Sequence, residues 1–345
     1  MIQTEKAAEK REAWVDGVKV VACVLVTLGH FFQSMVNSDI LIGNDFLMWF
    51  DESIYFFHVQ LFFMMSGYLH QKRQKFFSSA RAWLRNALNK LVNLGIPYFT
   101  FGSITIALKW LAEDSVNGQV NGLFYGLFVV PQSPYWYLFA LFFMFLLVPP
   151  IKSRKALWVI VTAAVSLHLA VSFLEMGETF YTVKIVARNL VWFVLGMAFR
   201  KAKMTEKLNA FTCITGMIFI PASVIVYTAN VQFCARELIM GFLGCLMVIS
   251  VMYLLNKKCR QSKLSTLLTE YTFPVFLMHT IFAAGFRILL LKCGITSAVI
   301  HLGGGIFISF AGPMLAAWVM HQLKYPEYLL YPEKSACVKK FLSVK

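Results

Sequence analysis

The stretch WVDGVKVVACVLVTLGHFFQSMV, residues 14–36, decides the fold of this chain. It is longer than the roughly 20 apolar residues that a helix needs to cross a bilayer. Only helices or closed barrels satisfy their backbone hydrogen bonds in lipid, and an unbroken run of this length is too long for a barrel strand. Similar runs follow, so the sequence predicts an all-α membrane protein with about ten transmembrane helices. We expect them at residues 15–36, 50–69, 91–111, 135–151, 156–174, 184–199, 210–228, 238–255, 271–291 and 298–321.

The composition also indicates that the main partner of this protein is the lipid bilayer. Of the 345 residues, 59% are hydrophobic and 14% are charged, whereas soluble domains carry about 25% charged residues. The net charge of +15 does not indicate a nucleic-acid partner, because the basic residues lie in short loops between the apolar runs. The seven cysteines form no CxxC pair, so we expect neither a disulfide framework nor a metal site.

The distribution of positive charge predicts the orientation. With ten spans, 26 of the 32 lysines and arginines fall on one side of the membrane. Positive residues mark cytoplasmic loops, so both termini are expected in the cytoplasm. We predict a cytoplasmic tail at residues 1–14, a single transmembrane domain at 15–321, and a second cytoplasmic tail at 322–345. This organisation is that of a multi-pass protein of the cytoplasmic (inner) membrane.

The first span carries two ionisable residues, Lys19 and His30, 11 residues apart. At 100° per residue they lie on one helix face, separated by a rise of about 16 Å. Lys19 is expected near the cytoplasmic surface and His30 in the outer half of the membrane. An ionisable residue inside a span is a functional candidate. The alternative is that Lys19 extends to the surface and His30 bonds a neighbouring helix.

The second span adds His58, which we expect at a depth similar to that of His30, so that both could face one cavity. His58 could equally bond only a backbone or hydroxyl group. Ser66 and Gly67 follow near the cytoplasmic end. Gly67 permits a close backbone approach, either for a ligand or, more simply, for a neighbouring helix.

Charged and aromatic residues outside these two spans give further candidates. A basic run that includes Arg85 and Lys90 could bind lipid head groups, set the topology, or bind a phosphate-rich cytosolic donor. On the outer side, Tyr135 and Trp136 could anchor the interface or form a platform for a sugar ring. His279 lies near the middle of the ninth span, and Arg188 enters the sixth; these four outer residues are the candidates for binding an acceptor.

These motifs together resemble the membrane acyltransferase 3 family. The resemblance rests mainly on two motifs: the Lys19–His30 spacing preceded by Asp16-Gly17, and the segment HVQLFFMMSGYL at 58–69. Weaker similarities are IPY at 96–98, WYL at 136–138 and YTFPVFLMH at 271–279. With its histidine at position 58, the chain resembles the fucose 4-O-acetylase-like branch of this family. Many members carry an Arg-x-x-Arg pair where this chain has Lys90 and Asn93, and no SGNH hydrolase domain is recognised here.

The resemblance implies acyl transfer across the membrane. Acetyl-CoA, a co-substrate and not a permanently bound cofactor, would give its acyl group to a hydroxyl of a cell-envelope carbohydrate or lipid-linked sugar. Lys19, Ser66, Arg85 and Lys90 are then expected to contact the donor. A hydroxyl is a poor nucleophile, and a histidine titrates near neutral pH, so His30 is expected to be the general base, with His58 as the second catalytic candidate. An acyl-histidine intermediate is the alternative mechanism.

A transporter or flippase for an envelope glycan precursor is the rival interpretation, because such a protein also needs charges within the membrane. Transporters of many folds show internal repeats with broken helices at matching positions. The sequence shows neither feature. The acyltransferase interpretation also explains the same-face pair Lys19 and His30, which a purely structural scaffold does not.

Overall fold

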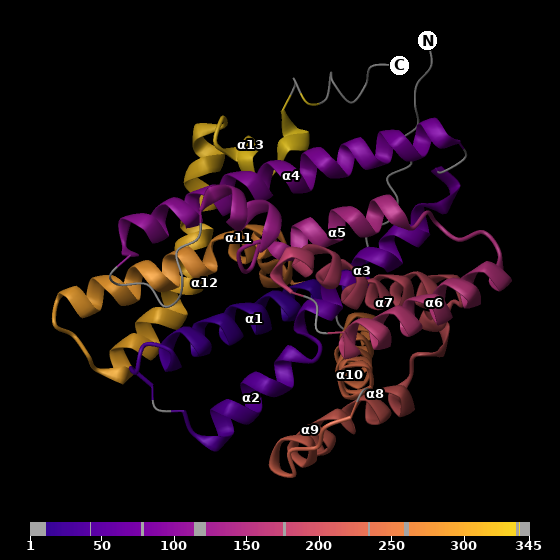
Figure 1. Ribbon diagram of the computed structural model, residues 1–345, viewed down its shortest axis with the longest axis horizontal. Helices are drawn as coiled ribbons and strands as arrows, with labels where there is room; N and C mark the ends of the chain where they lie inside the picture. The colour runs from indigo at the N-terminus through magenta and orange to yellow at the C-terminus, as the bar shows by residue number, and fades with distance from the viewer. Residues whose placement is uncertain are drawn as a thin grey trace.

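The computed structural model describes residues 12–41, 43–76, 79–113, 122–174, 177–233, 235–258, 262–335 and 338. Most of the predicted N-terminal tail, residues 1–14, and the end of the predicted C-terminal tail, residues 322–345, therefore lie outside the described residues. Within these ranges the chain forms helices and turns and no strand (Figure 1). Eight helical segments are long and apolar enough to cross a membrane. The prediction of an all-α membrane protein is confirmed.

Helix α1, Ala13–Val36, lies at the centre of the arrangement. It packs against α3 (His58–Lys72), α10 (Arg236–Lys258), α11 (Lys263–Lys292) and α12 (Ala298–Leu323), and Figure 1 shows it crossing the middle of the molecule. Its buried side includes Val18, Ala22 and Val26, which follow the four-residue spacing of one helix face. This position lets one helix line cavities on both sides of the protein.

The predicted second span, residues 50–69, is divided into two helices. Asn44 caps α2, Asp45–Tyr55, by accepting a hydrogen bond from Leu47 N, and α3 begins at His58. At the break, the Ile54 carbonyl accepts bonds from the Phe57 N–H at 3.1 Å and the His58 ring at 2.7 Å. A side chain thus takes the place of a regular helical donor. This local bond lies at the break that divides the predicted second span.

The close crossing of α3 with α7, Tyr181–Lys201, depends on two glycines. A Cβ atom at Gly67 would lie 1.9 Å from the carbonyl oxygen of Phe193, and one at Gly196 would lie 2.0 Å from that of Met64. Each glycine therefore meets backbone of the opposite helix, where any larger residue would overlap. Of the two uses considered for Gly67, helix packing is the one seen in the structure.

The other helices differ from the predicted spans mainly at their ends. Helix α4, Ala80–Leu111, begins 11 residues before the predicted span because Ser79 caps it, accepting a bond from Ala82 N. At about 48 Å it exceeds the hydrocarbon thickness. Pro97 and Pro274 lie within α4 and α11. Helices α6 (Arg154–Phe173), α7, α10, α11 and α12 match predicted spans, several with extra turns.

Two further predicted spans are interrupted or short. Helix α5, Trp136–Leu147, has 12 residues, about 18 Å, because Pro149 and Pro150 end the run predicted to reach residue 151. The predicted span 210–228 consists of α8, Ala210–Met217, and α9, Phe219–Thr228. The divided second span and the 12-residue α5 are the two predicted spans absent from the eight long apolar segments.

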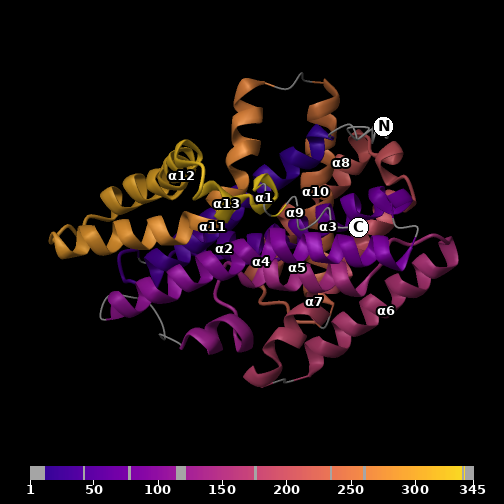
Figure 2. The same cartoon turned by 90° about the horizontal axis from the view of Figure 1, so that it is seen from above.

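The helices form two groups around α1. Helices α11 and α12 pack against each other and extend away from α6 and α7, as Figure 2 shows. On the other side, α7 packs against α3, α5 and α6. Part of the predicted C-terminal tail is also folded. Helix α13, Glu327–Leu330, packs against α4 and α12, and Leu330 is buried.

Candidate functional site

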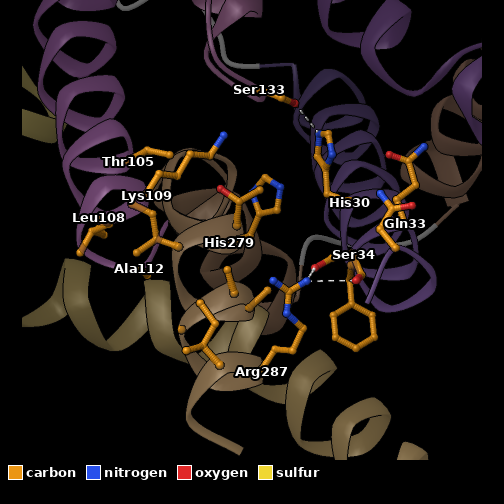
Figure 3. A pocket seen from close by; sticks show the side chains of 18 residues that line it. His30, Gln33, Ser34, Thr105, Leu108, Lys109, Ala112, Ser133, His279 and Arg287 are labelled. Atoms are coloured by element: carbon orange, nitrogen blue, oxygen red, sulfur yellow. Dashed lines mark hydrogen bonds between the residues drawn. The ribbon is translucent and has the colours of Figure 1, made fainter. Parts of the chain in front are cut away.

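A cavity of about 410 Å³ opens between α1, α4 and α11 in the predicted outer half of the protein. His30 and Ser34 line it from α1, Lys109 from α4, and His279 and Arg287 from α11 (Figure 3). Ten of its 18 lining residues have polar or charged side chains, although most of the surface that the lining leaves open is apolar. This is the composition expected of a binding site for a small molecule.

His30 and His279 stand together in this cavity. Their rings stack with centroids 5.5 Å apart and an angle of 28° between the planes. Nε2 of His30 lies 3.3 Å from the Ser133 hydroxyl, on the segment that leads into α5. A hydroxyl at this nitrogen occupies the place where an acceptor hydroxyl would have to lie. This 3.3 Å contact is slightly longer than the roughly 2.6–3.2 Å reach of a general base, and it shows that a hydroxyl group can approach Nε2 of His30.

The hydrogen bonds of His279 define its tautomer. Its Nδ1 lies 3.0 Å from the carbonyl oxygens of both Val275 and Phe276, which can only accept, so Nδ1 carries the proton. Nε2 is left as a buried acceptor with no hydrogen-bond partner among the described residues. A buried polar atom without a partner is uncommon, and in a cavity wall it is open to a ligand's donor. Sequence reasoning placed His279 among the acceptor-binding residues, and the structure brings it to His30.

His58 does not line this cavity. Its ring is buried, Nδ1 is taken by the Ile54 carbonyl, and the Tyr55 ring packs on it at 4.5 Å. Tyr55 also contacts His30, at 6.4 Å between ring centroids. The expectation that His30 and His58 face one cavity is therefore wrong in this structure. A depth argument could not show that the ring of Tyr55 would lie against both.

A second cavity of about 370 Å³ lies at the predicted cytoplasmic end of α1. Lys19, Ser66 and Lys90, three of the four predicted donor-binding residues, line it together. Lys72 and Arg73 join them. Clustered cations of this kind suit phosphate groups. Nζ of Lys90 also lies 4.2 Å from the centre of the Phe145 ring, which places its ammonium group against α5.

Glu12 ties this end of α1 to α3 and α7. Its carboxylate accepts a hydrogen bond from Tyr68 at 2.7 Å and pairs with Lys72 at 3.0 Å and Arg200 at 3.5 Å. Burial raises the pKa of the carboxyl, but the bonds from Tyr68 and Lys72 and the nearby positive charges outweigh it, so the pKa lies below its ordinary value. Glu12 is therefore ionised at neutral pH and holds the cavity wall in place.

The remaining predicted site residues lie apart from both cavities. Arg85 is exposed on α4 and does not line the cytoplasmic cavity. Tyr135 is fully buried, so its ring presents no face to a sugar. Its hydroxyl lies 2.9 Å from the carbonyl oxygen of Leu277 and 2.8 Å from the Thr105 hydroxyl, and these bonds join α4 to α11. Trp136 packs on Phe63. Arg188 pairs with Glu237 on α10. None of these three lines the outer cavity.

Sequence reasoning missed several residues of the outer cavity: Gln33, Thr105, Lys109, Ser133 and Arg287. The signal for two of them was available. Lys109 and Arg287 belong to the six positive residues that the topology count leaves on the outer side. Across the described residues, no group of three or more His, Cys, Asp or Glu side chains could hold a metal ion.

Comparison with known proteins bears on these two cavities. A family model described as an acyltransferase domain, that of acyltransferase 3, matches residues 12–318. The chain belongs to the acyltransferase 3 family. The match extends over α1 and every other helix that contributes to the two cavities of this acyltransferase-family protein. Its residues Lys19 and His30 thus lie within the shared domain.

A relative found among curated proteins is the nodulation protein NolL of Sinorhizobium fredii (strain NBRC 101917 / NGR234). It is 28% identical to this acyltransferase 3 family member over 197 residues, which are 56% of this chain and 50% of NolL. The chain thus spans about half the length of the curated relative that it matches. No solved structure matches the chain.

Proposed function

We propose that this protein transfers an acetyl group from cytosolic acetyl-CoA to a hydroxyl of a cell-envelope glycan or lipid-linked sugar on the outer side of the membrane. The observation that carries the proposal is the placement of two different cavities along one helix. Lys19 lines a cationic cavity, and His30, about 16 Å further along α1, lines a cavity with a paired histidine. Membership of the acyltransferase 3 family supports the reaction class.

The cytoplasmic cavity suits the nucleotide end of the donor. Lys19, Lys90 and Lys72 supply positive charge for the phosphates of coenzyme A, and the Ser66 hydroxyl is a neutral hydrogen-bonding group at the wall. The pantetheine arm of the donor is long and thin, and its thioester must reach the level of His30. The nucleotide would stay at the cytoplasmic end while the acetyl group is presented outward.

The transfer step uses His30 as the general base. Nε2 of His30 removes the proton from the acceptor hydroxyl as the oxygen attacks the thioester carbonyl. The new C–O bond forms, the C–S bond breaks, and the proton passes from His30 to the departing sulfur of coenzyme A. Atoms and charges balance, and no other co-reactant is needed. His279 faces the same space with an unprotonated Nε2, so it is placed to hold a second hydroxyl of the acceptor.

The test is acetyl transfer by purified protein. Wild type and His30→Gln, each in detergent, are supplied with radiolabelled acetyl-CoA and a set of methyl glycosides, and both labelled glycoside and free coenzyme A thiol are measured. Glutamine can form hydrogen bonds but cannot accept the proton, so it is a matched control for His30. We expect acceptor-dependent transfer by wild type, reduced roughly 10²- to 10⁴-fold in the variant.

Two results would contradict the proposal. If wild-type protein releases no more coenzyme A thiol than His30→Gln, with or without acceptor, there is no histidine-dependent acyl transfer. The transporter interpretation then becomes the better one. If wild type instead acetylates itself at His30 in the absence of acceptor, detectable by mass spectrometry, the acyl-histidine route replaces the general-base route.

A further inference from the structure

The outer cavity is lined by two basic side chains and by no carboxylate. Lys109 on α4 and Arg287 on α11 both line it, and none of its lining residues is an aspartate or glutamate. Figure 3 shows both side chains around the same hollow as His30 and His279. Uncompensated positive charge inside a membrane domain is costly, and such residues usually pair with each other or mark a ligand site.

Arg287 is nearly fully buried, with 3% of its surface exposed. One guanidinium nitrogen, Nη1, donates to the Ser34 carbonyl at 3.0 Å and to the hydroxyls of Ser34 and Ser38, each at 2.6 Å. These neutral oxygens orient the guanidinium but do not neutralise it. Its Nε is buried without a hydrogen-bond partner among the described residues. An arginine held in this way keeps capacity for a further acceptor.

Lys109, like Arg287, donates to a neutral oxygen. Its Nζ donates to the side-chain carbonyl of Gln132 at 2.6 Å, again a neutral acceptor. Two carboxylates are near in the sequence or the fold. Asp51 accepts a bond from Gln33 at 3.0 Å, and Glu113 is exposed next to Ala112. Neither forms an ion pair with Lys109 or Arg287 within the part of the chain that the structure describes.

We propose that the acceptor carries an anionic group, a carboxylate or a phosphate, which lies between Lys109 and Arg287 while its hydroxyl lies at His30. The inference rests on the proposed acetyl transfer and deepens it by naming the substrate class: an acidic sugar or a sugar phosphate. The unpartnered Nε of Arg287 and the Nζ of Lys109 supply the charge-assisted donors that an anion needs. His30 and His279, on the same wall, then meet the neutral hydroxyls.

The proposal explains how the cavity could select its acceptor. Charge-assisted bonds from two cations favour an acidic sugar over a neutral one of the same shape, because the neutral sugar would leave both cations unpaired. The same charges would not serve the thioester, which is neutral. They also lie apart from the cytoplasmic cavity, where Lys19 and Lys90 are available for the donor phosphates.

The experiment compares three sugars of one ring configuration: methyl glucoside, methyl glucuronide and glucose 1-phosphate. Binding to the full-length protein in detergent is measured by equilibrium dialysis with labelled sugar, and acetyl transfer is measured separately. The variants are Lys109→Gln, Arg287→Gln and Arg287→Lys. Lys292→Gln is the control, because Lys292 is exposed at the end of α11 and does not line the cavity.

We expect wild type to bind one or both charged sugars more tightly than methyl glucoside. Lys109→Gln and Arg287→Gln should weaken charged-sugar binding roughly ten- to a hundredfold, while Arg287→Lys and Lys292→Gln should stay within about threefold of wild type. Comparison of the two charged sugars distinguishes a carboxylate from a phosphate. Should Arg287→Gln fail to fold, Lys109→Gln carries the test, since its side chain is only partly buried.

Equal binding of charged and neutral sugars by wild type would overturn the proposal, whatever the transfer assay shows. A loss of turnover with all three sugars, without any change in binding, would also overturn it and assign the cations to the oxyanion of the transition state. Charge-selective binding without any acetyl transfer would leave the anion site standing and remove the proposed function. The two hypotheses therefore fail by different results.

Discussion

The cytoplasmic and outer cavities differ in how their charges are balanced. The cytoplasmic cavity has more cations, but Glu12 and Asp16 lie among them. The outer side of the protein has few positive residues, yet two of them converge on one cavity without a carboxylate in its lining. The amount of charge on one side of a membrane protein is thus a poor guide to where unbalanced charge lies.

The difference also fits the two ligands that we propose for these cavities, the phosphates of a donor and an anionic acceptor. In the proposed donor site, Glu12 and Asp16 lie among the cations that would bind phosphates, so the local positive charge is partly offset. A buried anion site needs fewer cations held more rigidly, as Arg287 is by Ser34 and Ser38. Substitutions in each cavity test whether the two cavities act as independent sites.

The largest effect is expected at His30. His30→Ala should lower acetyl transfer roughly 10²- to 10⁴-fold, because it removes the proposed proton acceptor. It should leave acetyl-CoA affinity unchanged, because the proposed site for the donor phosphates lies at the other end of α1. Transfer is measured with labelled acetyl-CoA and affinity by equilibrium dialysis.

His58→Gln is the matched comparison for this effect. His58 bonds the Ile54 carbonyl and lies outside the cavity, so its replacement should alter thermal stability more than the transfer rate of the folded protein. If His58→Gln abolishes transfer and His30→Ala does not, the base has been assigned to the wrong histidine.

The next effect concerns the crossing of α3 with α7, which supports the cytoplasmic cavity and not the outer one. Ser66 and Lys72 line that cavity from α3, and Gly67 sets how closely α3 approaches α7. Gly67→Ala should destabilise the protein by about 3 kcal/mol or more, because the new methyl group would overlap the Phe193 backbone. Thermal unfolding in detergent measures this loss.

Gly303→Ala on α12 is the control, because nothing lies within 4 Å of a Cβ placed there. It should leave stability unchanged or slightly increased, since alanine favours helix more than glycine does. An unfolding temperature of Gly67→Ala equal to that of wild type would mean that the two helices are not in backbone contact.

Much of this architecture was predictable from the sequence. Apolar run length predicted the helices because lipid leaves the backbone no other way to pair its hydrogen bonds. The break before His58 was not predictable, because it depends on a side chain replacing a backbone donor at Ile54. The short α5 had a visible cause in Pro149 and Pro150, which a count of apolar residues ignores.

The sites were predictable to different degrees for a similar reason. Lys19, Ser66 and Lys90 meet in one cavity, and their family motifs or local charge had marked them. Lys109 and Arg287 were missed because each lies near the end of a span, where an isolated positive residue is usually an interface residue. Their convergence comes from the packing of α4 against α11, which no local pattern in the sequence expresses.

A moderate effect is expected at the donor cavity. Lys19→Ala should weaken acetyl-CoA binding by about 1.5–3 kcal/mol, the contribution of one hydrogen bond to a charged group. Lys90→Ala should act in the same direction. Arg85→Ala is the matched control, because Arg85 lies on the same helix as Lys90 but does not line the cavity. Affinity is measured by isothermal titration.

Equal losses in all three variants would indicate a diffuse electrostatic effect of the basic segment, with no discrete donor cavity. A loss confined to Lys19 and Lys90, with sugar binding at the outer side unaffected, would sharpen the distinction between the cavities.

The smallest effect is the sensitivity of the cytoplasmic cavity to acid. The pKa of Glu12 lies below its ordinary value in the folded protein, so its ion pairs with Lys72 and Arg200 contribute stability that is present above the ordinary pKa of about 4.3. This contribution is lost as the pH falls through the lower, folded-state pKa. Glu12→Gln lacks it at every pH.

The unfolding temperature of wild type should therefore exceed that of Glu12→Gln at pH 7, and the difference should begin to shrink as the pH falls below about 4. Glu206→Gln provides the control, because Glu206 forms only an exposed pair with Lys203, which contributes little. A difference between wild type and Glu12→Gln that stays constant down to pH 3 would show that Glu12 acts through its shape and neutral hydrogen bonds. Of the two carboxylates that distinguish the cytoplasmic cavity from the outer one, Glu12 would then not be an electrostatic element of it.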